Sequence, residues 1–210
     1  MMKKILMMLT ALCLLLPTVE AQNKALEKAR KKEYQRKLKE FKKDDWKVFG
    51  TARSFEVALL QHYDKLNNLG DNGTEIVGAA SKFKSKNIGH QMAINNACMT
   101  YAQQAGSQLK GRIVSDMNAN GTDGEGEFEK MYAAYERLVE KEIKGEMKET
   151  FSVIRDNGDG TFEMQSFFIV DENAASAARI RAIESAAKES TVAQKYAQKI
   201  SDFVKEGVKN

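Results

Sequence analysis

The feature that most constrains the fold is a proline-free run of small and apolar residues from Asn87 to Lys110. Apolar positions in this run recur at spacings of three and four residues, which predicts one long amphipathic helix. The residues on this stripe are Ile94, Ala97, Cys98, Tyr101, Ala102, Ala105 and Leu109. Because most of them are small, a neighbouring element can approach the helix closely. The side chains expected against a sheet, beside the last helix of the chain, are Ala97, Cys98, Ala102 and Ala105.

A second alanine-rich helix is expected near the end of the chain. Asp171 stands where it can cap the first turn of this helix. The small and apolar residues that follow at helical spacing are Ala174, Ala178, Ile180, Ala182, Ile183, Ala186 and Ala187. The pattern continues from Val192 to Val204. Two helices with small-residue surfaces indicate a fold in which helices pack closely.

Four segments have the alternating pattern of β-strands: residues 46–52, 74–83, 146–155 and 162–170. Between the last two, residues 156–160 read Asp-Asn-Gly-Asp-Gly, which tolerates the positive φ angles of a hairpin loop. The apolar residues expected on one face of each hairpin strand are Met147, Phe151 and Val153 in the first and Phe162, Met164, Phe168 and Val170 in the second.

Two more amphipathic helices are predicted, over residues 54–66 with Ser54 as its cap and over residues 128–143. Strands and helices in this order predict an α+β fold. We expect a small, mainly antiparallel sheet of about four strands, covered on one face by the alanine-rich helices. The domain would span residues 46–210.

Residues 1–21 have the features of a secretory signal peptide. Lys3 and Lys4 precede an apolar run of twelve residues, 5–16, and Val19-Glu20-Ala21 fits a small-x-small cleavage site. The run is too short to span a bilayer, which takes about 20 helical residues. We therefore expect export to the periplasm or outer envelope, with Gln22 as the first mature residue. Cys13 lies inside the apolar run, so it fits poorly as a lipid-attachment site.

Residues 22–45 are expected to form a basic helical arm. Residues 22–47 contain eleven Lys and Arg against five acids, whereas residues 48–210 contain twenty against twenty-three. Such an arm, 23–47, can contact a polyanion or an anionic membrane surface. The alternative is a solvated helix between the export signal and the domain, which its thin apolar stripe favours. Nucleic acid is the least expected partner, because the basic excess is confined to this segment.

Cys98 is the only cysteine left after residues 1–21 are removed, so no disulfide within the chain is expected. It lies on the apolar stripe, where a cysteine usually acts as a small buried hydrophobe. His62 falls beside an apolar stripe with no Cys, His or paired carboxylate nearby in the sequence, so we interpret it as a structural residue.

Residues 116–127 match the spacing of an EF-hand calcium loop. The oxygen ligands would be Asp116, Asn118, Asn120, the Thr122 carbonyl and Glu127, with Gly121 at the sharp turn. However, Asp123 stands where these loops normally have an aliphatic residue, and the sequence has no second loop to pair with it. The alternative is a polar connection between helices. Calorimetry of calcium binding, with Glu127→Gln as the control, tests the hypothesis.

The sequence contains no motif that predicts catalysis. A Gly-x-Ser-x-Gly elbow, a phosphate loop and a Cys-x-x-Cys motif are all missing, and the two histidines, His62 and His90, have no spacing that brings them together. A screen for hydrolase activity with His90→Ala as control would test for an enzyme. We expect none, and no cofactor other than calcium.

The order of elements resembles the Lpp-twenty-like family of bacterial envelope lipoproteins over residues 46–187. The resemblance rests on Trp46 before a Val-x-Gly-x-Ala strand, alanine-rich helices after strands, a hairpin and a last alanine-rich helix. It implies a secreted α+β protein of the outer envelope without an established enzymatic site. This chain departs from the family in lacking a cysteine suited to lipid attachment.

Together these observations predict a non-catalytic, secreted cell-envelope protein that acts as a binding or structural module. Its expected partner is another envelope protein or a surface polymer. The alternatives are a calcium-binding protein that uses residues 116–127 and a protein that binds a polyanion or membrane surface through residues 23–47.

Overall fold

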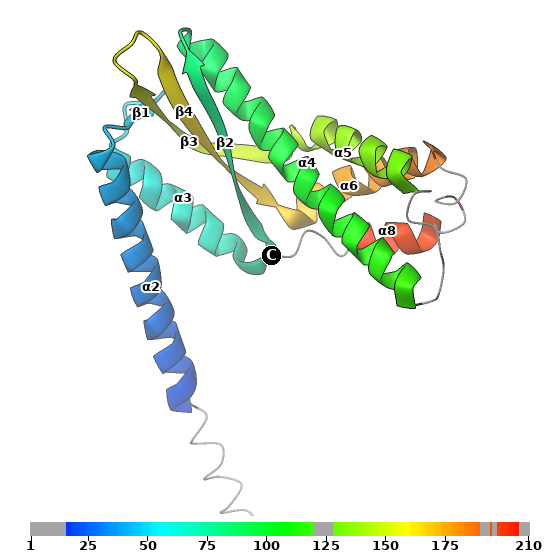
Figure 1. Ribbon diagram of the computed structural model, residues 1–210. Coiled ribbons are helices and arrows are strands. Elements are labelled where there is room, and N and C mark those ends of the chain that lie inside the picture. The colour runs from blue at the N-terminus through cyan, green and yellow to red at the C-terminus, as the bar shows by residue number, and fades with distance from the viewer. Residues whose placement is uncertain (1–15, 120–127, 190–193, 195–196, 206–210) are drawn as a thin grey trace, which may run out of the picture. The chain divides into compact units, whose positions relative to one another are not determined.

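A computed structural model describes residues 16–119, 128–189, 194 and 197–205 (Figure 1). The chain divides into two compact units, Met1–Asp45 and Trp46–Asn210. In the first unit, helix α2 spans Leu16–Lys43, so it begins before the position expected for the arm. Its side chains from Lys24 to Glu33 are exposed.

The second unit contains one sheet and a set of helices. The elements, in chain order, are β1 (Lys47–Phe49), α3 (Phe55–Leu69), η1 (Gly70–Asn72), β2 (Gly73–Phe83), α4 (Lys86–Ala119), α5 (Glu129–Ile143), β3 (Met147–Asp156), β4 (Phe162–Asp171), α6 (Glu172–Ala186), η3 (Ala187–Glu189) and α8 (Ala197–Lys205). The four strands are antiparallel in the order β1-β3-β4-β2. The predicted α+β fold is confirmed.

Helices lie on both faces of the sheet, α4 on one and α3 on the other (Figure 1). Alternation along β4 defines the two faces. Met164 and Phe168 point to the α4 side and join the hydrophobic core there. Phe167 points to the α3 side, where its ring meets that of His62. The expectation that helices cover one face was therefore incomplete, because the helix predicted over residues 54–66 covers the second face.

Close packing of α4 on the sheet depends on small residues. A Cβ atom at Gly78 in β2 would lie 1.9 Å from the carbonyl oxygen of Ala93 and 2.9 Å from the Cβ of Ala97. Only glycine permits this approach of helix backbone to strand backbone. The Nδ2 of Asn96 adds a hydrogen bond of 2.6 Å to the carbonyl of Ala79. Of the four side chains predicted to lie against the sheet, Ala97 does so at Gly78. Ala105 lies farther along α4, beside Phe203 and Val204 of α8.

Helix α4 is longer than the predicted run 87–110. It continues to Ala119, and Ile113 is 4% exposed in the same core cluster as Leu109. These two residues are four positions apart, so they share one helical face. Burial of Ile113 explains why the helix does not end at Gly111, whose Cβ position is open.

Strand β1 is shorter than the predicted run 46–52. It pairs with β3 only from Lys47 to Phe49. The next residue, Gly50, has a φ of 76°, which is incompatible with a continuing strand. The strand therefore ends before this glycine, although the alternating sequence pattern continues to residue 52.

A β-bulge in β3 corrects the predicted faces of the hairpin. The pairing with β4 shifts between Glu149 and Phe151. Met147 consequently joins the core on the α4 side, whereas Phe151 stacks on Phe167 on the α3 side. The prediction that Met147 and Phe151 share a face was wrong, because the extra residue, Thr150, changes the phase of the alternation.

Helices α5, α6 and α8 build the core beyond the sheet together with α4. Asp171 caps α6 as predicted, since its Oδ1 accepts a hydrogen bond from the backbone N–H of Asn173 at 3.0 Å. The hairpin loop also has the predicted conformation, with positive φ at Gly158 and Gly160. Among the described residues, no helix has the length and apolar character needed to cross a membrane.

Candidate functional site

His62 on α3 is held through both ring nitrogens although only 1% of its surface is exposed. Its Nδ1 lies 2.7 Å from Oγ1 of Thr150, and its Nε2 lies 2.8 Å from Oε2 of Glu75. Thr150 Oγ1 donates its own hydrogen to the carbonyl of Phe167 at 2.9 Å. The hydroxyl therefore accepts from His62, so Nδ1 carries a hydrogen.

The second contact, between His62 on α3 and Glu75 on β2, crosses from helix to sheet. It lies on the opposite edge of the ring from the bond to Thr150 of β3. His62 thus joins α3 to two strands of the sheet.

Aromatic rings enclose the His62 ring. The rings of Tyr63, Phe151 and Phe167 meet it edge-on, with centroids 5.5, 5.5 and 5.9 Å away. Phe151 and Phe167 also stack on each other with their centroids 4.4 Å apart. A substrate cannot reach a ring covered in this way. The interpretation of His62 as a structural residue agrees with this enclosure, and the partly exposed Thr150 lies between the ring and the surface.

Thr150 lines a cleft of about 370 Å³ at the end of α3. We call this the α3 cleft. The residues around it are Lys65, Asn68 and Leu69 from α3, Glu146, Lys148 and Thr150 in and beside β3, Ile169 and Asp171 from β4, and Ala174 from α6. Its volume falls within the range of about 300–1,000 Å³ typical of ligand pockets.

The α3 cleft combines charged walls with apolar contacts. Lys65 and Lys148 are both exposed, and no ion pair of either lysine is present among the described residues. Leu69, Ile169 and Ala174 supply apolar surface. The lining also includes the carboxylates of Glu146 and Asp171. Two ammonium groups and two carboxylates beside an apolar surface suit a ligand that has an anionic group, a hydrogen-bond donor and a small apolar part.

A second polar cluster lies on the α4 side of the sheet. Nε2 of His90 donates to both carboxylate oxygens of Glu149, at 3.0 and 2.9 Å. Ser152 also donates to Glu149, and its Oγ lies 2.7 Å from that of Ser166. His90 and Ser152 both bond to the Glu149 carboxylate and not to each other, so His90 does not activate Ser152, which is only 1% exposed. The arrangement is unsuited to nucleophilic catalysis.

A third cluster is buried between helices. The Arg179 and Glu172 side chains are 2% and 7% exposed and form an ion pair. Tyr101 on α4 donates to Glu172 at 2.9 Å and accepts a hydrogen bond from Arg179. Burial raises the pKa of Tyr101 and of Tyr135, so both hydroxyls stay protonated. A buried ion pair needs such partners, and the loss of one is costly.

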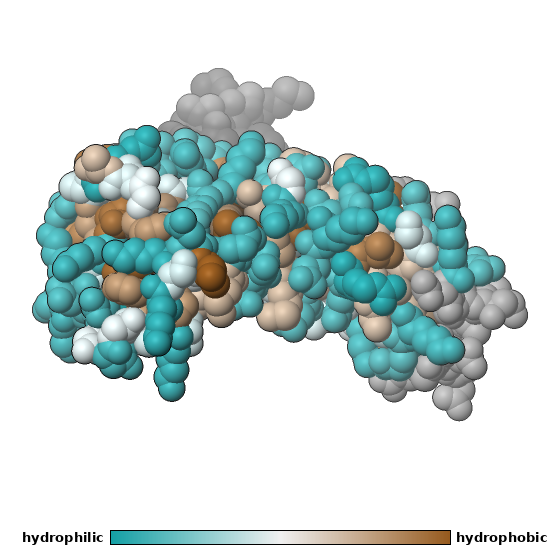
Figure 2. All heavy atoms as spheres, turned by 90° about the horizontal axis from the view of Figure 1, so that it is seen from above, coloured by the Kyte–Doolittle hydropathy of each residue, from teal (hydrophilic) through white to brown (hydrophobic). Residues whose placement is uncertain are grey.

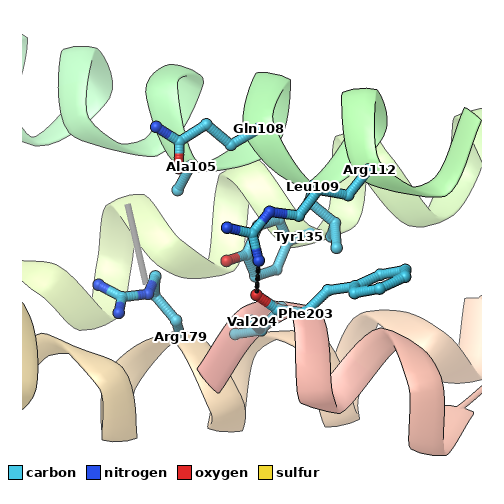
Figure 3. A pocket seen from close by; sticks show the side chains of 8 residues that line it. All are labelled: Ala105, Gln108, Leu109, Arg112, Tyr135, Arg179, Phe203 and Val204. Atoms are coloured by element: carbon cyan, nitrogen blue, oxygen red, sulfur yellow. Dashed lines mark hydrogen bonds between the residues drawn. The ribbon is translucent and has the colours of Figure 1, made fainter. Parts of the chain in front are cut away.

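The cavity beside this cluster is too small for a ligand. Its volume is about 10 Å³, which is room for roughly one water molecule. Figure 3 shows its lining residues: Ala105, Gln108, Leu109, Arg112, Tyr135, Arg179, Phe203 and Val204. Arg112 donates to the carbonyl of Phe203 at 2.8 Å and so fastens α8 to α4 (Figure 3). The cluster is therefore part of the helical core.

Only part of the predicted calcium loop lies within the described residues. Asp116 and Asn118 belong to the last turn of α4. Asn120, Thr122 and Glu127 fall outside the described residues. Within the described part of the chain, no three His, Cys, Asp or Glu side chains form a group that could hold a metal ion. Calcium binding at residues 116–127 stays a prediction.

Cys98 is buried, at 3% exposure, in the core cluster. Burial raises the pKa of its thiol, which keeps it neutral. A buried, neutral thiol is a poor nucleophile. The interpretation of Cys98 as a small buried hydrophobe agrees with this position.

The sequence did not reveal the partners of His62. Glu75 and Thr150 are 13 and 88 residues away from it, and a lone carboxylate in a strand gives no signal. The sequence likewise did not indicate the α3 cleft, because its lining comes from four elements. Of the residues that line it, Lys148 is a charged residue in a predicted strand, which indicates that this part of the strand faces solvent.

No protein-family model matches the chain, and neither a curated protein nor a solved structure matches it. The resemblance to the Lpp-twenty-like family stays a prediction from residues 46–187.

Proposed function

We propose that this chain is a non-catalytic, exported envelope protein that binds a segment of another protein or of a surface polymer in the α3 cleft. The segment would present an anionic group to Lys65 and Lys148. Its apolar part would lie on Leu69, Ile169 and Ala174. The observation that carries the proposal is the α3 cleft itself, with two lysines that form no ion pair among the described residues.

The chemistry of the cleft supports binding and not turnover. The only hydroxyl among its lining residues is that of Thr150, which already donates to the carbonyl of Phe167. Its neighbour His62 donates through Nδ1 and is enclosed by rings. A nucleophile needs an adjacent base that can take its proton, and His62 does not act as one here.

Thr150 adds a further element of recognition. Its hydroxyl has one hydrogen and two lone pairs. The hydrogen and one lone pair are used by Phe167 and His62. The remaining lone pair can accept a hydrogen bond from a donor on the ligand, such as an amide N–H. A segment with an amide N–H close to its anionic group, as at the end of a peptide, fits this requirement.

Two small probes test the proposal. N-acetyl-leucine has an amide, an apolar side chain and a carboxylate, whereas N-acetyl-leucinamide lacks only the charge. In NMR titrations we expect the first probe to shift the amide signals of residues 146–150 and 169–174, and the second to shift them at least tenfold more weakly. Equal shifts with both probes, or shifts elsewhere only, would contradict the proposed site.

Variants locate the interaction. Lys65→Gln combined with Lys148→Gln should abolish the shifts caused by N-acetyl-leucine. The matched control is Lys130→Gln combined with Lys141→Gln, which removes two exposed lysines from α5. Persistent binding by the first double variant would show that the cleft lysines do not hold the carboxylate.

The natural partner can be captured in cells. A photo-crosslinking amino acid in place of Asn68 would lie in the α3 cleft, and one in place of Arg137 would lie on the exposed side of α5. We expect a product that forms from position 68 and is lost in the Lys65→Gln, Lys148→Gln background. The same product from both positions would argue against a specific site.

The export part of the proposal rests on the basic and apolar pattern of residues 3–21. N-terminal sequencing of the protein purified from cells should begin at Gln22. A chain that retains residues 1–21 in the cytoplasmic fraction would refute export, without bearing on the cleft.

A further inference from the structure

Between residues 87 and 109, the face of α4 that the core does not use contains no Asp, Glu, Lys or Arg. Residues 87–109 include no Asp, Glu, Lys or Arg, in a chain in which these make up 30% of the residues. Burial does not explain this, because nine of the positions are exposed. These are Asn87, Ile88, Gln91, Met92, Asn95, Met99, Gln103, Gln104 and Ser107. We call this set the uncharged face of α4.

The neighbouring helix α5 shows that the absence is specific to α4. The exposed positions of α5 are Glu129, Lys130, Ala133, Arg137, Glu140 and Lys141, of which only the alanine is uncharged. The two helices pack against each other in the same unit. An ordinary solvated face in this protein is therefore charged. The central part of a protein interface, by contrast, is depleted in charge and enriched in Met.

The exposed apolar side chains of α4 form a stripe. Ile88, Met92 and Met99 are 60%, 41% and 43% exposed. With Asn95 they are spaced by four, three and four residues, so they lie along one side of the helix. Figure 2 shows hydrophobic colour gathered mainly toward the end of the molecule that holds the hairpin and the start of α4.

Farther along α4, helix α5 covers the same stripe. Gly106 continues the spacing, and a Cβ there would meet the Glu136 side chain of α5 at 2.3 Å. Helix α5 thus covers the stripe from about Ala102 onward, since Ala102 is 2% exposed. The earlier half of the stripe, residues 88–99, is a surface of the same kind that α5 does not cover.

The chemistry of the uncharged face points to a second copy of the same chain. In a two-fold contact each face meets itself. Asn, Gln and Ser carry both donors and acceptors, so they can pair with their own kind, whereas Lys only donates and ionised Glu only accepts. Six of the nine exposed positions are Asn, Gln or Ser. The protein has a formal net charge of +4, and a contact through an uncharged face keeps like charges apart.

We propose that the chain self-associates through the uncharged face of α4, with two α4 helices antiparallel about a two-fold axis near Asn95. In this arrangement Met92 of one copy meets Met99 of the other, and this contact occurs twice. Ile88 of each copy lies near Gln103 of its partner. One helix face packed on another buries less surface than the roughly 1,200 Å² or more of stable interfaces. The dimer therefore forms at micromolar or higher concentrations.

Sedimentation equilibrium of the purified protein from about 1 to 500 μM measures the association. We expect a monomer–dimer equilibrium with the unchanged chain. Met92→Lys and Met99→Glu, each alone, should raise the dissociation constant at least tenfold, because each buries an unpaired charge. The matched control is Val57→Lys combined with Leu60→Lys, which changes exposed apolar residues of α3 and should leave the constant unchanged.

Mixing the two single variants tests the geometry. A copy with Met92→Lys and a copy with Met99→Glu would place the new ammonium and carboxylate together at one contact and leave the second contact apolar. Association of the mixture should therefore recover to within threefold of that of the unchanged chain. Thermal melts of each variant check that it is folded.

Several outcomes would overturn the proposal. These are a monomer at every concentration, a dimer that neither single variant weakens, and a mixture that stays as weak as its components. A photo-crosslinking amino acid in place of Met92 provides a further check. Products with other proteins but none with a second copy of the chain would likewise reject self-association.

Discussion

The two faces of the sheet are covered in different ways. On the α4 side, Gly78 and Ala93 bring helix and strand backbones into direct contact. On the α3 side, the large rings of Phe151 and Phe167 separate α3 from the sheet and surround a buried polar group, His62. The α4 side is stabilised by direct packing of helix on strand, and the α3 side by aromatic packing and hydrogen bonds.

This difference explains where a ligand can enter. A helix in contact with strand backbone leaves no space for a pocket. A helix held away from the sheet by large side chains leaves room at its end, where the α3 cleft lies. We infer that direct packing of α4 on the sheet contributes stability, whereas the α3 side combines a structural interior around His62 with the proposed binding rim of the α3 cleft. The following predictions test that division.

The largest effect is expected from Gly78→Ala. The new Cβ would meet the Ala93 carbonyl oxygen at 1.9 Å, so the backbone of α4 must move. We expect a loss of about 3 kcal/mol in the free energy of unfolding, at the upper end for overpacking, and a fall in Tm of roughly 6–12 °C. The control, Gly111→Ala, has open space around its Cβ and should be neutral or stabilising. Similar melting temperatures for the two variants would contradict close packing at Gly78.

The two histidines should differ when each is replaced by phenylalanine. His62→Phe retains a ring but leaves Thr150 without its donor in a buried site, so we expect a cost of about 1–3 kcal/mol. His90 is 30% exposed in its pair with Glu149, so His90→Phe should cost less than about 1 kcal/mol. Urea denaturation measures both. An equal cost would show that the buried hydrogen bonds of the α3 side contribute no more than an exposed pair.

The helical core on the α4 side should lose stability at alkaline pH. Burial raises the pKa of Cys98, Tyr101 and Tyr135 in the folded chain. All three groups are neutral in both states below the unfolded thiol pKa of about 8.5, so stability is unaffected there. Above that pH the unfolded chain releases protons that the folded chain keeps, and the free energy of unfolding falls.

The tyrosines contribute to this fall from about pH 10, and each costs about 1 kcal/mol by pH 11. Urea denaturation at pH 8, 9.5 and 11 measures the effect. Tyr135→Phe should make the decline between the last two values shallower. An unchanged decline in that variant would mean that Tyr135 ionises alike in both states.

The sequence predicted those parts of the fold that depend on local pattern. The stripe through Ala97 and Cys98 identified the long core helix, because helical spacing and small side chains are visible in a single segment. The hairpin was predicted from Asp, Asn and Gly at residues 156–160, and Gly158 and Gly160 have the positive φ angles that such a loop requires.

The α3 side could not be predicted, because its features depend on contacts between distant segments. The bulge at Thr150 breaks the alternation of β3, and an alternating sequence pattern does not reveal a bulge. The partners of His62 are distant in the sequence, since Glu75 and Thr150 meet it only after the sheet has formed. Periodicity identifies elements, but it does not identify which buried polar groups pair.

The smallest effect is expected at the rim of the α3 cleft. Lys65→Gln combined with Lys148→Gln removes two exposed charges that make no ion pair among the described residues, so the free energy of unfolding should change by less than about 0.5 kcal/mol. The same double variant should lose the binding of N-acetyl-leucine. If the double variant keeps its stability but loses binding, the structural and binding roles of the α3 side belong to different residues. A loss of stability near that of His62→Phe would instead mean that the lysines support the fold, and that the α3 side is not divided between a structural interior and a binding rim.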